Sequence, residues 1–262
     1  MSVLHRKLYR DLMHMWGQAL AIVLVIGCGV ATFVMSLSTL ESLQVTQEAY
    51  NDRYRFADVF DALKRAPNAL AARIAEIPGV ARVQTRIVQD VTLDVEGLVE
   101  PAVGRLISIP ERESPILNQV HLREGRYIEP GRKGEVLASE HFVNAHGMQA
   151  GDTVTAVING RLETLHIVGV ALSPEYVMQL RAVGDVPDDK RFGVFWMGEK
   201  ELAAGFDLEG AFNDVTLSLM HGASEDEVIR RLDLLIEPYG GVGSYGRDDQ
   251  LEEFLIEFRV DP

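Results

Sequence analysis

The longest apolar run of the chain lies near its N-terminus. No Asp, Glu, Lys or Arg occurs between Asp11 and Glu41, and most of this interval is aliphatic. A helix needs about 20 apolar residues to cross the hydrocarbon core of a bilayer. The segment from Gly17 to Leu40 has this length, and no later segment does. The pattern therefore predicts one transmembrane helix over residues 17–40, which continues as a polar helix to Tyr54.

Beyond residue 41, short runs with period two alternate with short runs of helical period. The pattern predicts an α+β fold, that is, a mixed α/β domain over residues 41–262 with a β-rich subdomain at about 110–190, small-barrel or sandwich-like. Asn159-Gly160 is typical of a tight hairpin turn. The predicted strands cover residues 57–64, 80–95, 99–109, 135–139, 153–158, 162–170, 192–197 and 214–219, and the predicted helices cover residues 68–76, 140–146, 199–204, 224–236 and 248–258.

Charge indicates how the helix is oriented. Arg6, Lys7 and Arg10 precede the apolar run, whereas Glu41 and Glu48 follow it. Basic flanks stay in the cytoplasm, so residues 1–16 are predicted to be cytoplasmic and residues 41–262 to lie outside. The first forty residues carry a net charge of +2 of the total of −14, which leaves −16 for the outer part. Such an acidic domain is unsuited to binding nucleic acid.

The single cysteine, Cys28, admits two interpretations. Val25-Ile26-Gly27-Cys28 resembles a bacterial lipobox, in which the cysteine would be lipidated, but the chain stays apolar after it. In the other interpretation Gly27, Cys28 and Ala31 are small residues that let a neighbouring helix pack closely. A cleaved signal peptide would have a shorter apolar core and a small-residue cleavage site. With its only cysteine in the span, the outer domain has no disulfide.

Motifs for chemistry are scarce. The segment 241–246 matches G-x-G-x-x-G, but a helix rather than a strand is predicted before it, so we interpret it as a turn. The seven histidines lack metal-ligand spacing, and the serines lack the G-x-S-x-G elbow. No phosphate-binding G-x-x-x-x-G-K-[ST] loop occurs. The sequence therefore predicts no catalytic residue, cofactor or metal site, and any ATPase would be a separate chain.

Two stretches, residues 125–176 and 192–219, carry a resemblance to a known family. The most specific parts are G-E-V-L-x-S at 134–139, the G-x-x-x-G-D turn at 147–152, and the paired strands that end at Val168-Gly169. With the first helix, they resemble the permease subunits of FtsX-like ABC transporters and their MacB-like periplasmic core domain. The resemblance covers essentially the whole chain.

The resemblance implies a non-catalytic subunit of the bacterial inner membrane. Its partners would be a cytoplasmic ABC ATPase and further permease helices or a second permease copy, and its cargo a lipoprotein, peptide or other hydrophobic molecule. The span and the 248–258 helix would then be two mechanical connections to the membrane. Family members continue into further transmembrane helices, so we expect the N-terminal portion of a permease. The alternatives are a single-span periplasmic binding or adaptor protein, or a lipoprotein anchored at Cys28.

Overall fold

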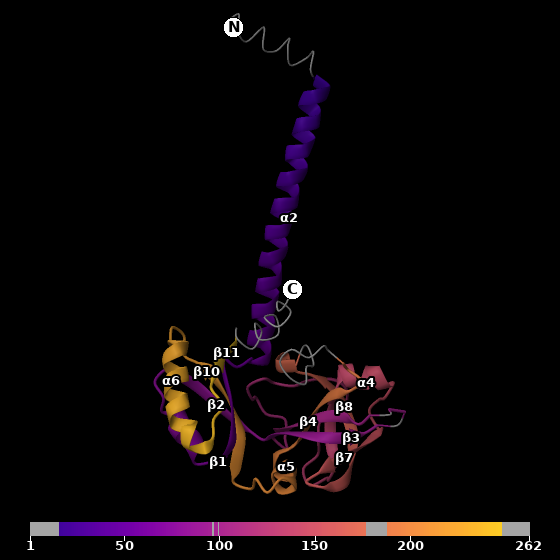
Figure 1. Ribbon diagram of the computed structural model, residues 1–262, viewed down its shortest axis with the longest axis vertical. Helices are drawn as coiled ribbons and strands as arrows, with labels where there is room; N and C mark the ends of the chain where they lie inside the picture. Colours follow the sequence, from indigo (N-terminus) through magenta and orange to yellow (C-terminus); the bar gives the residue numbers. More distant parts are fainter. Residues whose placement is uncertain (1–15, 96, 99, 177–187, 248–262) are drawn as a thin grey trace, which may run out of the picture. The chain divides into compact units, whose positions relative to one another are not determined.

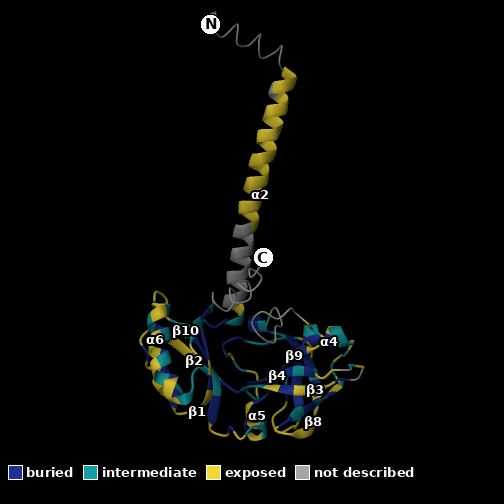
Figure 2. Ribbon diagram, viewed as in Figure 1, coloured by how far each residue is buried: buried dark blue, intermediate teal, exposed yellow. Residues whose placement is uncertain are grey.

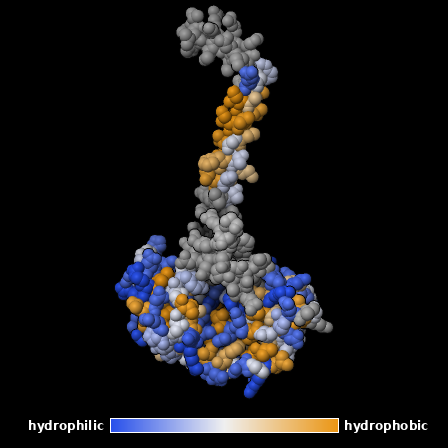
Figure 3. Space-filling view, viewed as in Figure 1, coloured by the Kyte–Doolittle hydropathy of each residue, from blue (hydrophilic) through white to orange (hydrophobic). Residues whose placement is uncertain are grey.

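The computed structural model describes residues 16–95, 97–98, 100–176 and 188–247, and it divides into two compact units, residues 1–51 and 52–262. Helix α2 (Trp16–Tyr54) occupies the predicted span and continues beyond it as expected. Its part from Trp16 to Thr39 has a mean hydropathy of 2.5 and is not buried by other parts of the chain (Figures 2 and 3). The helix is thus long and apolar enough to cross a membrane.

Two threonine hydroxyls of α2 are bonded within the helix itself. The hydroxyl of Thr32 donates to the carbonyl of Cys28 at 2.9 Å, and that of Thr39 donates to the carbonyl of Met35 at 2.8 Å. Such bonds to the preceding turn remove the cost of placing a hydroxyl in hydrocarbon.

The first and last strands of the outer unit form a four-stranded antiparallel sheet in the order β11-β1-β10-β2 (Figure 1). Helices α3 and α6 follow β1 and β10, and their apolar residues pack on one face of the sheet. This is the β-α-β-β-α-β order of ferredoxin-like folds, with a large insertion between its second and third strands. The elements are β1 (Val59–Pro67), α3 (Leu70–Ala75), β2 (Val80–Arg86), β10 (Ala211–Leu219), α6 (Glu225–Ile236) and β11 (Tyr245–Gly246).

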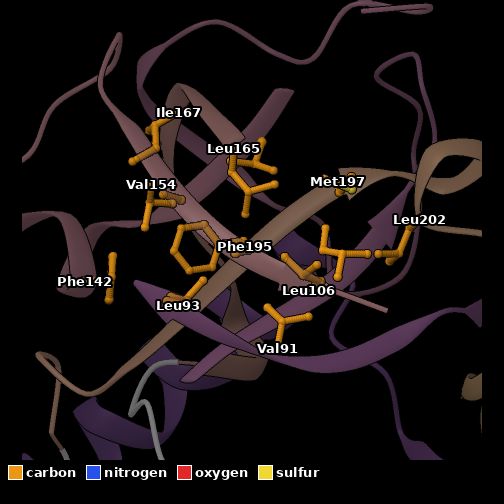
Figure 4. Close-up of a cluster of buried hydrophobic side chains, with 14 of the residues drawn as sticks. Val91, Leu93, Leu106, Phe142, Val154, Leu165, Ile167, Phe195, Met197 and Leu202 are labelled. Carbon is orange, nitrogen blue, oxygen red and sulfur yellow. The ribbon is translucent and has the colours of Figure 1, made fainter. Parts of the chain in front are cut away.

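The insertion is a small β-barrel. Its strands follow the order β5-β8-β6-β9-β4-β3-β7, and β7 also pairs with β8, which closes a ring of six strands with β5 attached outside it. Aliphatic and aromatic side chains from the strands and from α4 and α5 fill the interior (Figure 4). The elements are β3 (Val88–Asp94), β4 (Ala102–Ile109), β5 (His121–Gly125), β6 (Glu135–Ser139), α4 (Glu140–His146), β7 (Thr153–Ile158), β8 (Arg161–Leu172), η1 (Pro174–Tyr176), β9 (Phe192–Gly198) and α5 (Glu199–Gly205).

Most predicted elements of the barrel are confirmed. The strands at 135–139 and 153–158 and the helix at 140–146 have the predicted bounds. Gly147 ends α4 with a φ of 64°, and Asn159-Gly160 forms the hairpin turn with φ values of 48° and 77°. The α+β fold class is confirmed. Strands outside residues 110–190, namely β3, β4 and β9, also belong to the β-rich part.

The prediction of one strand over residues 80–95 is wrong. The run divides at Ile87: β2 belongs to the four-stranded sheet and β3 to the barrel. Where the chain passes from one sheet to the other, its backbone N–H groups bond to side chains instead of to the backbone of a neighbouring strand. Ile87 N–H donates to Ser108 Oγ and Val88 N–H donates to Asn213 Oδ1, both at 2.8 Å. Strand β5, which lies in the stretch 110–135, is not among the predicted strands. The predicted helix 248–258 lies outside the described residues.

Candidate functional site

The last described residue of the outer unit lies against the segment that follows α2. Arg247, the last described residue, lies against residues 56–58, the first residues after α2. Its guanidinium donates to the carbonyls of Phe56 and Ala57 at 2.8 and 3.0 Å and to the carboxylate of Asp58 at 2.6 Å. Its charge also lies over the Phe56 ring, 5.3 Å from the centroid. Strand β1 begins directly after residues 56–58 and β11 ends directly before Arg247, and the two strands pair, so these two segments are held together by both sets of bonds.

A loop before β5 holds the entry segment. Asn118 has a φ of 51°, a left-handed conformation that asparagine tolerates better than most residues. Its N–H donates to the carbonyl of Arg55 at 3.0 Å, and Gln119 N–H donates to the carbonyl of Tyr54 at 2.9 Å. Its side-chain oxygen accepts the N–H of Ala57 at 2.8 Å. The loop thus caps the carbonyl of Tyr54, the last residue of α2, and the carbonyl of the residue that follows it.

A buried ion cluster joins this loop to both sheets. Arg86, at the end of β2, is only 6% exposed; it donates two hydrogen bonds to Glu175 of η1 and one to Asp214 of β10 at 2.7 Å. Glu175 also accepts from the amide of Asn118 at 2.7 Å. One guanidinium therefore connects the four-stranded sheet, the segment that follows β8 and the loop that caps α2. We call Phe56, Ala57, Asp58, Arg86, Asn118, Glu175, Asp214 and Arg247 the joint.

The electrostatics of the joint follow from burial and close pairing. Burial works against the charge of Arg86, but Asp214 and Glu175 outweigh it and hold the pKa of Arg86 well above its usual value. Burial raises the pKa of Asp214, although Arg86 opposes the shift. Burial likewise raises the pKa of the Tyr176 hydroxyl beside the cluster. Opposite charges in such a dry site hold each other firmly, and neither can be removed alone without leaving the other unpaired.

A second polar cluster holds the loop before β11. Asp61 of β1 is 1% exposed, and its carboxylate accepts the hydroxyl of Ser244 at 2.6 Å. Asp233 of α6 accepts the N–H of Ser244 at 2.8 Å. Burial, with a smaller contribution from the charge of Asp233, raises the pKa of Asp61 to about 6, although the Ser244 bond opposes it. The G-x-G-x-x-G segment is thus a loop that packs on a buried carboxyl and leads into β11.

The barrel has a cleft at one end. It has a volume of about 900 Å³ and lies between the first half of β8, helix α5 and the loop before β6. Apolar side chains form part of its lining, and charged side chains surround them. Its size is within the range of ligand sites in proteins. Among the residues that the structure describes, no group of three or more His, Cys, Asp and Glu side chains could hold a metal ion.

The candidate residues of the span lie on α2. Cys28 is exposed, and a Cβ added at Gly27 would meet nothing within 4 Å. Gly27, Cys28 and Ala31 are all on the part of α2 that other described residues leave uncovered, so their role in helix packing stays a prediction. The sequence patterns did not reveal the joint, because Arg86, Asn118, Glu175 and Asp214 are isolated polar residues far apart in the chain.

The chain is similar to known proteins in its structure. No family model matches the chain, and no curated protein is similar to it in sequence. The chain is similar to the extracellular domain of the noncanonical ABC-type transporter YknZ from Gram-positive bacteria, with 13% identity over 72% of this chain and 98% of that one and a TM-score of 0.43. It is also similar to the periplasmic region of MacB from Actinobacillus actinomycetemcomitans, with 11% identity over 81% of this chain and 98% of that one and a TM-score of 0.45.

Proposed function

We propose that the chain is all or part of a membrane subunit of an ABC-type transporter, in which α2 crosses the cell membrane and residues 41–262 lie and work outside. The N-terminus would be cytoplasmic, because Arg6, Lys7 and Arg10 precede the span. A cytoplasmic ATPase and further permease helices or a second permease copy would complete the transporter, and the membrane would be the bacterial inner membrane.

One observation supports the mechanical part of the proposal, namely that the segment after α2 is bonded to the last described residue of the domain. Arg247 bonds to residues 56–58, and the Asn118 loop caps the end of α2. A displacement of the chain at this point would act on both segments and, through Arg86, on both sheets. Movement of α2 would therefore pass into the outer domain as a displacement of whole sheets, since their packed cores resist deformation.

Orientation is tested by accessibility of single cysteines. In a Cys28→Ser background, Leu234→Cys places a thiol on the exposed face of α6, and Ser2→Cys places one before the span. A membrane-impermeant maleimide added to intact spheroplasts should label position 234 and reach position 2 only after permeabilisation. Labelling of position 2 alone in intact spheroplasts would refute the proposed orientation.

Coupling is tested in the assembled transporter. Arg247→Gln removes the charge that bonds to the segment after α2, whereas Arg231→Gln removes an exposed arginine of α6 that pairs with Glu227. We expect Arg247→Gln to lower cargo-dependent stimulation of the ATPase severalfold at unchanged membrane insertion, and Arg231→Gln to have no effect. Stimulation that is equal in both variants would contradict the role of the joint. A chain that purifies without any ATPase would instead favour the anchored binding protein.

A further inference from the structure

Strand β8 has different neighbours along its two halves. Its first half, from Arg161 to His166, pairs with β7 on one edge. On the other edge, β6 pairs with β8 only from His166 onward. In the part of the chain that the structure describes, no strand pairs with residues 161–165 on this second edge. The second edge of this half is therefore an open strand edge.

Hydrogen bonds farther along β8 show where the groups of this edge point. His166 N–H donates to the carbonyl of Gly134 on the β6 side at 2.7 Å, whereas Ile167 N–H donates to Asp152 on the opposite side at 2.9 Å. Because backbone groups alternate between the two edges of a strand, Leu162 and Thr164 direct theirs to the β6 side. Both residues line the cleft. Their N–H and C=O groups therefore form one side of it.

The edge stays open because β6 begins late. At Gly134 the backbone has a φ of +74°, and a Cβ there would lie 2.6 Å from the carbonyl oxygen of Thr164. The N–H of Gly134 donates to Glu201 of α5 at 2.6 Å instead of pairing with β8. The N–H of Gly134 is thus directed at α5, and residues 131–134 line the cleft together with α5 and the first half of β8.

The cleft has an apolar floor and an exposed apolar side chain on its open edge. Leu162 is 72% exposed. An open edge with such a residue readily pairs with another strand, and proteins usually protect edges with charge. The outer strand β5 has this protection in Arg123 and Glu124, both exposed. The buried apolar residues that line the cleft are Ile128, Ile158, Leu165, Met197 and Leu202.

The charges of the cleft leave an excess of carboxylate. Three of the lining carboxylates are paired with bases, in the pairs Arg132–Glu129, Lys200–Glu111 and Arg126–Glu135. The remaining charged or titratable lining residues are two carboxylates, Glu163 and Glu201, one lysine, Lys133, and one histidine, His166. Burial, together with the charge of Glu163, raises the pKa of Glu201, although the Gly134 N–H opposes the shift. The site therefore favours a ligand that brings positive charge.

We propose that the open edge of β8 binds an extended segment of a partner polypeptide, which adds as a strand beside residues 162–164, inserts aliphatic side chains above the apolar floor and places a Lys or Arg near Glu163. Unpaired backbone groups along one side of the cleft favour an extended backbone, and the buried apolar residues beside them favour aliphatic side chains. This inference goes beyond the proposed function and does not depend on a transport role, since it concerns the barrel alone.

The test uses the full chain in nanodiscs and a fluorescein-labelled nonapeptide of alternating Lys and Val. We expect saturable binding by anisotropy. Binding should weaken at least tenfold when alternate peptide amides are N-methylated, because the side chains are kept but the donors are lost. A peptide of alternating Glu and Val should also bind at least tenfold more weakly. Absence of binding, or equal binding of the N-methylated peptide, would overturn the proposal.

Variants of the edge give an independent test. Thr164→Pro removes an N–H that faces the cleft while leaving the bonds to β7, and Thr164→Val keeps that N–H. We expect at least a tenfold loss of affinity in the first variant and less than a twofold change in the second. If Thr164→Pro lowers the melting temperature, Leu162→Lys replaces it and should give the same loss. Disulfide-linked dimers of Leu162→Cys in the Cys28→Ser background would show a second copy on the edge and would overturn the proposal.

Discussion

Replacing Arg86 by methionine removes the centre of the joint while keeping most of the side-chain volume. The change leaves Glu175 and Asp214 without their counter-ion in a site where Arg86 itself is 6% exposed. Breaking a buried ion pair by removing one partner costs about 3–5 kcal/mol, because the remaining charge is buried and unpaired. The two carboxylates also repel each other, which raises the pKa of Asp214 further. We therefore expect a loss of about 4 kcal/mol in the free energy of unfolding at pH 7.

Urea unfolding of the full chain in detergent measures this loss. Trp196 of β9 is 3% exposed in the barrel, so its fluorescence reports unfolding of the outer domain. With a urea dependence of about 2 kcal/mol per molar, the unfolding midpoint should fall by about 2 M. At pH 4.5 the fall should be smaller, because protonation of Asp214 in the folded variant removes part of the repulsion.

The matched control is Arg230→Met, which removes an arginine from an ion pair with Glu227 on the exposed face of α6. An exposed pair contributes less than about 1 kcal/mol, so the midpoint should shift by less than about 0.5 M. If Arg86→Met shifts the midpoint no more than this control does, the joint does not hold the two sheets together, and the reasoning is refuted.

Three further changes test single features of the domain. Asp61→Asn should raise the free energy of unfolding at pH 7 and abolish the loss of stability that the wild type shows as the pH rises from 4 to 6. The folded pKa of about 6 means that the buried carboxyl is tolerated while protonated, whereas its charged form becomes costly as the pH rises through that value. Gly193→Ala should cost about 1–3 kcal/mol, because its Cβ would lie 2.5 Å from the Phe142 ring, whereas Gly198→Ala, with contacts of 3.6 Å or more, should cost a few tenths. Asn118→Ala should cost about 2–4 kcal/mol, because two buried partners lose their hydrogen bonds.

Thermal unfolding of the full chain checks these three predictions. A melting temperature of Asp61→Asn that keeps the wild-type pH profile would show that another group titrates between pH 4 and 6. Equal losses in the two glycine variants would contradict the close packing at Gly193. Asn118→Gly makes neither bond but relieves the left-handed backbone, so it should be more stable than Asn118→Ala by about 1 kcal/mol. Full wild-type stability in both variants would mean that these bonds contribute nothing.

Local patterns were sufficient where the neighbours of a residue in sequence are also its structural neighbours. The apolar run from Gly17 to Leu40 predicted α2 because a helix satisfies its own backbone bonds whatever surrounds it. The segment from β6 to β8 was predicted almost to the residue, since its turns depend on Gly147 and on Asn159-Gly160, whose left-handed backbone is a local property.

Only the tertiary structure decided how these elements are combined. The division at Ile87 depends on bonds to Ser108 and Asn213, which are distant in the chain, so no periodicity in residues 80–95 could reveal it. The same holds for the joint, where Arg86 meets partners 89 and 128 residues away. The open edge of β8 results from the late start of β6 at Gly134. The periodic spacing of apolar residues determines which residues are buried. The partners of buried charges and of strand edges depend on segments that are distant in sequence and become neighbours only in the folded chain.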